Sequence, residues 1–159
     1  MTRINASIPP ANLTDQHLMA EIKEINQLAG SFRKSTEKKN IHEIVKMLDE
    51  LPKTFRLGTG HVKFFYDKPR YLMKRFEMCK QEAIKRGFEV NAIFQDEWSR
   101  YMPNALTDDR YDYVPTKEAR ELLLERITLR LTEQKPVARY YRKEVSKQEA
   151  IELLNKQAA

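Results

Sequence analysis

The chain has 159 residues, 41% of them hydrophobic and 33% charged, a composition that supports one domain with a hydrophobic core and excludes an intrinsically disordered chain. No apolar run approaches the roughly 18 residues of a membrane-spanning helix, and a lone cysteine, Cys79, excludes an internal disulfide and a multi-cysteine zinc site. The net charge of +6 favours an acidic partner, nucleic acid or a membrane surface, with simple solubility as the plain alternative.

The chain opens with an irregular arm, residues 5–14, in which two consecutive prolines exclude a helix. Apolar residues then recur at helical spacing, which predicts an amphipathic helix over residues 15–35. Either Thr14 or Asp15 can cap the start of this helix, because each offers a side-chain oxygen to the free backbone N–H groups.

A similar cap, Asn40, precedes a short helix predicted over residues 41–51. Gly58 and Gly60 come next. Since no strand precedes them and no third glycine follows, they favour a tight turn over a phosphate-binding loop. A single helical turn is expected over residues 61–66.

The second main helix is predicted over residues 68–86. Asp67 is expected as its N-cap, Pro69 in its first turn and Gly87 just beyond its end. Cys79 lies on the apolar stripe of this helix, which indicates a buried thiol.

Residues 88–114 are acidic and irregular, and aromatic side chains such as Trp98 are expected to pin them to the helices. A third main helix is predicted over residues 116–133, and a capping box at Ser146 starts a short final helix over residues 147–157. No segment alternates like a strand. We therefore expect an all-α fold, a compact single-domain bundle of three main and two short helices.

The chain start carries the first candidate chemistry. If Met1 is removed, Thr2 has a free α-amine whose pKa, about 7.7–8.0, leaves a useful fraction neutral and nucleophilic. His17, Glu21 and Glu24 share one face of the first helix, and a carboxylate there is a plausible acid/base partner for the amine. The same three side chains are also compatible with a solvated helix face or, with lower prior, half of a metal site.

Basic residues are concentrated in residues 53–75 and 135–143, and Arg126 and Arg130 lie one helical turn apart. Aromatic residues are interleaved with them, a pattern that suits a nucleic-acid backbone and exposed bases. The alternative is a set of solvated helix faces with tyrosines in the core.

Several blocks of the sequence stand out together. The chain begins MTRIN, continues DQHLMAE over residues 15–21 and then has Glu24. The block TFRLGTGHVKFFYDK spans residues 54–68, and the shorter KRGF spans residues 85–88. These blocks resemble the phage-type pyrimidine dimer DNA glycosylase/apurinic-apyrimidinic lyase, the endonuclease V family.

The resemblance also has departures. A weaker match lies at residues 139–141, whereas residues 37–51 read as an insertion and residues 144–159 as an extension. Lys23 stands where the best-known member has arginine, so a bidentate phosphate contact becomes a point contact. Gln27 replaces a second arginine, and Val137 with Ala138 replaces an aromatic pair that helps to discriminate dimers.

The resemblance implies a mainly helical enzyme whose N-terminal arm packs between helices and which exposes the sugar beside a lesion in kinked DNA. The Thr2 amine would attack the sugar C1′, displace the base and form an imine, and β-elimination would then nick the strand. Glu24 would stabilise the positive charge on the sugar and assist proton transfers. No metal and no cofactor is implied. Residues at DNA-contacting positions are Arg3, Gln16, His17, Lys23, Arg33, Lys34, Arg126, Arg130, Arg139 and Tyr140.

The expected partner is double-stranded DNA that contains damaged bases, most plausibly cyclobutane pyrimidine dimers, or abasic sites. The protein would act as a monomer in the cytoplasm, that of a host cell if a phage encodes it; no secretory signal opens the chain. The alternatives are the same lyase chemistry on another modified base, or a non-catalytic helical DNA-binding protein on the same scaffold.

Overall fold

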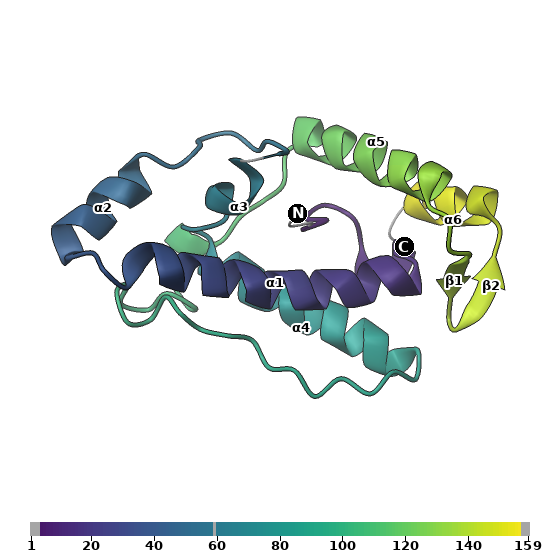
Figure 1. The fold of residues 1–159 in the computed structure, drawn as a ribbon, viewed down its shortest axis with the longest axis horizontal. Coiled ribbons are helices and arrows are strands. Elements are labelled where there is room, and N and C mark those ends of the chain that lie inside the picture. The colour runs from purple at the N-terminus through teal and green to yellow at the C-terminus, as the bar shows by residue number, and fades with distance from the viewer. Residues whose placement is uncertain (1–3, 59, 157–159) are drawn as a thin grey trace.

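Three long helices frame the molecule in the computed structural model, which describes residues 4–58 and 60–156. In Figure 1, helix α1 (Asp15–Thr36) crosses the centre, α4 (Pro69–Lys85) packs against it in the opposite direction, and α5 (Lys117–Glu133) lies on its other side. The shorter elements are α2 (Ile41–Asp49), α3 (Gly60–Phe64), α6 (Lys147–Leu154) and the 3-10 turns η1 (Pro10–Asn12) and η2 (Asp109–Tyr111). The expected all-α class is confirmed, and no helix of the described residues is long and apolar enough to cross a membrane.

The helix boundaries follow the sequence signals closely. Thr14 is the N-cap of α1, and its hydroxyl accepts a hydrogen bond from the His17 N–H. Asn40 forms a full capping box at α2. The expectation for α4 was wrong: its N-cap is Lys68, which makes no side-chain cap, and Asp67 accepts a hydrogen bond from Lys68 Nζ at 2.8 Å instead. Pro69 at the first position of α4 has no N–H, so one fewer backbone donor at the start of this helix needs a partner.

A small antiparallel hairpin, β1 (Ala138–Tyr140) and β2 (Lys143–Val145), was not expected from the sequence. Its two-residue turn has φ of 51° at Tyr141 and 66° at Arg142, as in the type I′ turns that suit the twist of paired strands. Asparagine and glycine usually occupy such a turn, and their absence here concealed the hairpin.

The hairpin turn is held by Asp15 at the start of α1. The backbone N–H groups of Tyr141 and Arg142 donate to its carboxylate at 3.1 Å and 2.7 Å. The buried guanidinium of Arg86 lies 2.9 Å from Asp15 and 4.6 Å from the centre of the Tyr140 ring. Together these contacts fix the hairpin against the beginning of α1.

Asp15→Asn is expected to destabilise the protein by about 1–3 kcal/mol, because an amide removes the charge that Arg86 pairs with and one acceptor of the turn. Urea denaturation measures the loss. The matched control is Asp109→Asn, whose side chain is 91% exposed and 3.0 Å from Arg70, and which should change stability by less than about 0.5 kcal/mol. Equal losses in the two variants would show that Asp15 does not anchor the hairpin.

The long segment between α4 and α5 is pinned by Trp98, as the sequence suggested. Its indole stacks on Phe32 of α1 with ring centres 4.9 Å apart, and Nε1–H donates to the Tyr66 carbonyl at 2.8 Å. At the other end of the molecule, α6 packs on α5 and β1 through buried Ala150 and Leu154. The first contact ties irregular chain to α1, and the second ties the last helix to α5.

Candidate functional site

The N-terminal arm lies between α1 and α5 (Figure 1), held along its length by buried polar side chains. Arg86 donates to the carbonyls of Pro10, Ala11 and Leu13. Further toward the chain start, the Tyr71 hydroxyl donates to the Ala6 carbonyl. These bonds satisfy backbone carbonyls along the arm and give it a defined path.

A buried ion pair holds the middle of the arm. Glu21 on α1 is fully buried and accepts from Arg75 of α4 at 2.5 Å and 3.0 Å. The same carboxylate accepts from the backbone and side-chain nitrogens of Asn5 at 3.2 Å and 3.0 Å, and Arg75 also donates to the Ile8 carbonyl at 2.6 Å. The arm, α1 and α4 therefore meet in one hydrogen-bonded network.

His61 of α3 holds the first described residue. Its Nε2 accepts from the Ile4 N–H at 3.2 Å, and its Nδ1 lies 3.2 Å from the Arg56 carbonyl. The carbonyl can only accept, so Nδ1 carries the proton and the ring is neutral. Burial lowers the pKa of His61 to about 4, an effect that the Arg56 hydrogen bond only partly offsets.

The depressed pKa of His61 predicts a specific acid sensitivity. Between pH 6.5 and 4 the unfolded chain takes up a proton at this ring and the folded protein does not, so folding stability falls as the pH falls. The expected loss is about 3 kcal/mol. His61→Gln cannot titrate, so urea denaturation from pH 7 to 4 should show a shallower decline in this variant than in the wild type. Parallel stability curves would contradict the prediction.

Glu24 lies one helical turn beyond Glu21 on the same face of α1, and only 9% of it is exposed. Its predicted partner Thr2, and Arg3 beside it, lie outside the described residues. The described residue nearest to them, Ile4, is fixed by His61, and Asn5 is fixed by Glu21. The buried carboxylate of Glu24 and the first described residues of the arm, Ile4 and Asn5, therefore lie on the same side of α1.

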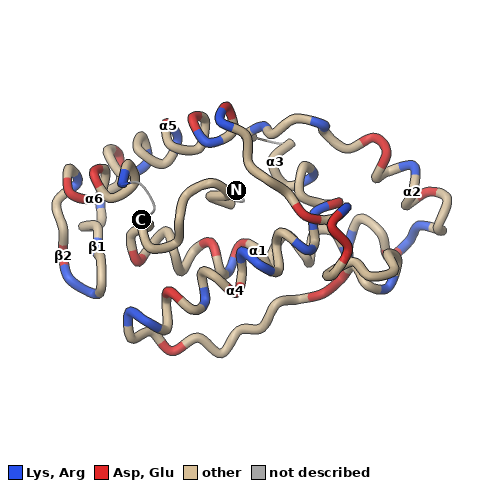
Figure 2. Tube along the Cα trace, turned by 180° about the vertical axis from the view of Figure 1, so that it is seen from behind, with Lys and Arg blue, Asp and Glu red and all other residues tan. Residues whose placement is uncertain are grey.

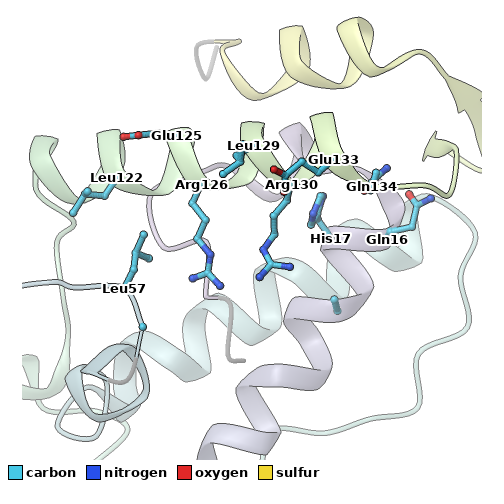
Figure 3. Close-up of a pocket in the computed structure, with 12 residues that line it drawn as sticks. Gln16, His17, Leu57, Leu122, Glu125, Arg126, Leu129, Arg130, Glu133 and Gln134 are labelled. Carbon is cyan, nitrogen blue, oxygen red and sulfur yellow. The ribbon is translucent and has the colours of Figure 1, made fainter.

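A cavity of about 900 Å³ opens between α1, α5 and the Leu57–Gly58 turn. Figure 3 shows Arg126 and Arg130 extending from α5 toward α1, and His17 extending from α1 toward α5. Asn5 of the arm lines a smaller adjoining space with the same three side chains. Three of the predicted DNA-contacting residues are therefore gathered beside the arm.

The remaining predicted contacts surround this centre. Gln16 lines the cavity, but its amide also binds the Val137 carbonyl at 2.6 Å and the Arg139 N–H at 3.0 Å. Lys23 is exposed along α1. Tyr140 donates its hydroxyl to the Ala11 carbonyl at 2.9 Å, and its ring packs on Arg86, so it supports the arm.

Arg33 and Lys34 are exposed on the last turns of α1, and Arg139 is exposed on β1. Arg33 lies 3.5 Å from Glu37 and 3.9 Å from Glu97, weak pairings for an exposed side chain. These basic groups are separated from the cavity along α1 or by the hairpin, so they lie on the periphery of the site.

The basic stretch at residues 53–75 does not form one exposed face. Lys68, Arg70, Lys74 and Arg75 each pair with a carboxylate of the protein. Figure 2 shows acidic residues gathered on the segment that leads into α5; Asp109 and Asp112 of this segment bind the α4 side chains. The acidic segment therefore neutralises part of the basic surface.

A family model for pyrimidine dimer DNA glycosylases matches residues 1–96, more than half of the chain. The chain belongs to the pyrimidine dimer DNA glycosylase family. The matched part contains the arm, α1 and α4, and with them Glu21, Glu24 and His61. Helix α5, the hairpin and α6 lie beyond it, although α5 supplies Arg126 and Arg130 to the cavity.

Membership in the glycosylase family supports the resemblance inferred from the sequence, and it implies a DNA substrate. Within residues 4–58 and 60–156, no three His, Cys, Asp or Glu side chains are grouped to hold a metal ion. The described site offers two groups on the side of α1 that faces the arm: the buried carboxylate of Glu24, and the guanidinium and imidazole groups of Arg126, Arg130 and His17 that line the cavity.

Proposed function

We propose that this glycosylase is bifunctional: it excises a cyclobutane pyrimidine dimer through an imine with the Thr2 amine and then nicks the strand as an apurinic/apyrimidinic lyase. Glu24 is the catalytic carboxylate. Family membership supports base excision at pyrimidine dimers. The observation that carries the finer proposal is the register of the arm against α1.

The register follows from two contacts. Arg86 joins Leu13 of the arm to Asp15 of α1, and Glu21 joins α1 to Asn5. Earlier residues of the arm thus lie beside later residues of α1. From Asn5, three residues toward the chain start lead to Thr2, and three residues further along α1 lead to Glu24. Two residues of extended chain reach at most about 7 Å beyond Ile4, and the proposal is that this span brings the amine to that carboxylate.

The reaction proceeds without a further reactant except water. The neutral amine bonds to C1′ as the bond between C1′ and the base breaks, and the base leaves with the electron pair and takes up a proton. Opening of the C1′–O4′ bond gives the imine. Loss of a C2′ proton then breaks the C3′–O bond and releases the 3′ phosphate. Glu24 stabilises the cationic sugar and accepts and returns protons in these steps.

Charge and shape support a DNA duplex at this face. Arg126, Arg130 and His17 can hold the phosphates next to the lesion, and the cavity of about 900 Å³ is large enough for an extrahelical nucleotide. From Gln16 to Lys34, α1 spans roughly 27 Å, so Lys23, Arg33 and Lys34 can contact flanking phosphates. The protein is proposed to act on the duplex as a monomer.

The test is a nicking assay on undamaged, ultraviolet-irradiated and abasic duplexes, with borohydride added to trap an imine. The proposal expects nicks and a covalent adduct on the irradiated and abasic duplexes only. Retention of Met1 or acetylation of the amine should abolish both. Salt-dependent binding without nicks or adduct would favour a non-catalytic DNA-binding protein, and an adduct on abasic DNA alone would assign the lyase to another damaged base.

A further inference from the structure

His61 is the anchor closest to the chain start among the hydrogen bonds of residues 4–58 and 60–156. Glu21 holds Asn5, Tyr71 holds Ala6 and Arg75 holds Ile8, whereas His61 holds the N–H of Ile4. The Ile4 N–H is therefore the backbone group nearest to the chain start that a side chain holds within the described residues.

We propose that His61 is a positioning residue, which holds the peptide at Ile4 and so aims the chain start at Glu24. The inference rests on the proposed function, because the aim matters only if the Thr2 amine reacts. His61 does not contact the substrate in this scheme; it acts through the backbone of the arm.

The surroundings of His61 fix both its orientation and its tautomer. The ring is 1% exposed and packs edge-on against Phe55 and Phe65, with ring centres 5.4 Å and 5.3 Å away. The Nδ1–H donates a hydrogen bond to the Arg56 carbonyl. The ring therefore presents one lone pair, on Nε2, and that lone pair faces the arm. A histidine that merely filled the core would not need an acceptor directed at this amide.

Protonation would release the arm, because imidazolium has N–H groups on both nitrogens and cannot accept from Ile4. The groups that face His61 oppose one another: Arg126 of α5 disfavours the positive charge and Glu21 of α1 favours it. Desolvation dominates, so the neutral form persists well below pH 6. The hydrogen bond from the Ile4 N–H to His61 is therefore present at neutral pH and is lost only in acid.

The test compares His61→Phe, which keeps a ring and removes the acceptor, with His61→Gln, whose amide oxygen can reach the position of Nε2. Single-turnover trapping on an abasic duplex should slow by about 10- to 100-fold in His61→Phe, because a small misplacement of a nucleophile has this effect. His61→Gln should return to within about threefold of wild type, given one retained hydrogen bond. DNA affinity should change by less than about twofold in both, since no phosphate contact is removed. The exposed His42→Gln is the matched control.

Hydrogen exchange at the Ile4 amide gives a second reading. Exchange should accelerate in His61→Phe, while the Asn5 amide, bound to Glu21, stays protected. Unchanged trapping in His61→Phe, or unchanged exchange at Ile4, would overturn the inference. If wild type itself forms no adduct, the proposed function fails and the catalytic role of His61 fails with it, while exchange still shows whether His61 holds the arm.

A pH profile decides the matter if His61→Phe does not fold. The ratio of the wild-type trapping rate to the His61→Gln trapping rate should fall to about half of its value at pH 7 as the pH approaches 4, because half of the His61 rings are then protonated. Glu24 and the amine titrate in both proteins, so their effects cancel in the ratio. A ratio that stays constant from pH 7 to 4 would overturn the inference.

Discussion

Glu24→Gln is expected to slow base excision by about 10²- to 10⁴-fold, the usual contribution of a positioned acid/base group. The amide keeps the shape of the side chain but can neither accept a proton nor balance the positive charge on the sugar. Because the carboxylate is only 9% exposed, solvent cannot replace it. The measurement is the single-turnover rate on a duplex that carries one pyrimidine dimer.

Affinity for the same duplex should change by less than about twofold in Glu24→Gln, because the basic residues that hold phosphates are intact. Glu121→Gln is the matched control, since this carboxylate is 65% exposed on α5 and lies 4.0 Å from Lys117. An excision rate within threefold of wild type in Glu24→Gln would remove Glu24 from the mechanism, with the imine at Thr2 still to be judged by trapping.

Arg75→Met is expected to destabilise the protein by about 3–5 kcal/mol, because it leaves the fully buried Glu21 carboxylate without its counter-charge. Burial opposes the charge of Arg75, yet the attraction and hydrogen bonds of Glu21 hold the pKa of Arg75 above its usual value, so the guanidinium stays charged. The loss of the bond to Ile8 should also loosen the arm. Urea denaturation measures the first effect, and borohydride trapping measures the second.

Lys74→Met is the control for Arg75→Met, since its side chain is 49% exposed and pairs with Asp112 at 2.6 Å. It should cost less than about 1 kcal/mol. Adding Glu21→Gln to Arg75→Met removes the stranded charge and keeps an acceptor for Asn5, so the double variant should regain part of the stability. If Arg75→Met and Lys74→Met lower the free energy of unfolding equally, the buried pair of Arg75 and Glu21 does not organise the arm.

The regular elements could be predicted because their signals are local. Apolar residues at helical spacing mark α1 and α4, and Thr14, Asn40 and Pro69 mark where helices begin. The family could be inferred for a similar reason, since the residues that carry the resemblance lie in unbroken blocks of sequence.

The contacts that shape the site are not local, and the sequence did not disclose them. Charged side chains are normally exposed, so Arg75 was read as part of a basic surface and Arg86 only as the end of a helix, although both are buried and paired across more than fifty residues. His61 stood alone in the sequence because its partner is a backbone N–H. Tyr140 stays a predicted DNA contact, and the sequence did not show that its ring and hydroxyl also bind the protein.

The docking of the hairpin turn on Asp15 sets an order for events during synthesis. The amides that Asp15 binds lie 126 and 127 residues later in the chain, and Asn12 bonds to the Lys156 carbonyl 144 residues away. On the ribosome, α1 can form early and Arg86 can bind the arm, but the contacts with the hairpin turn and with the Lys156 carbonyl form only after those late residues have emerged. A chain truncated before the hairpin should therefore keep α1 and the Arg86 contacts with the arm but lose both of these long-range supports.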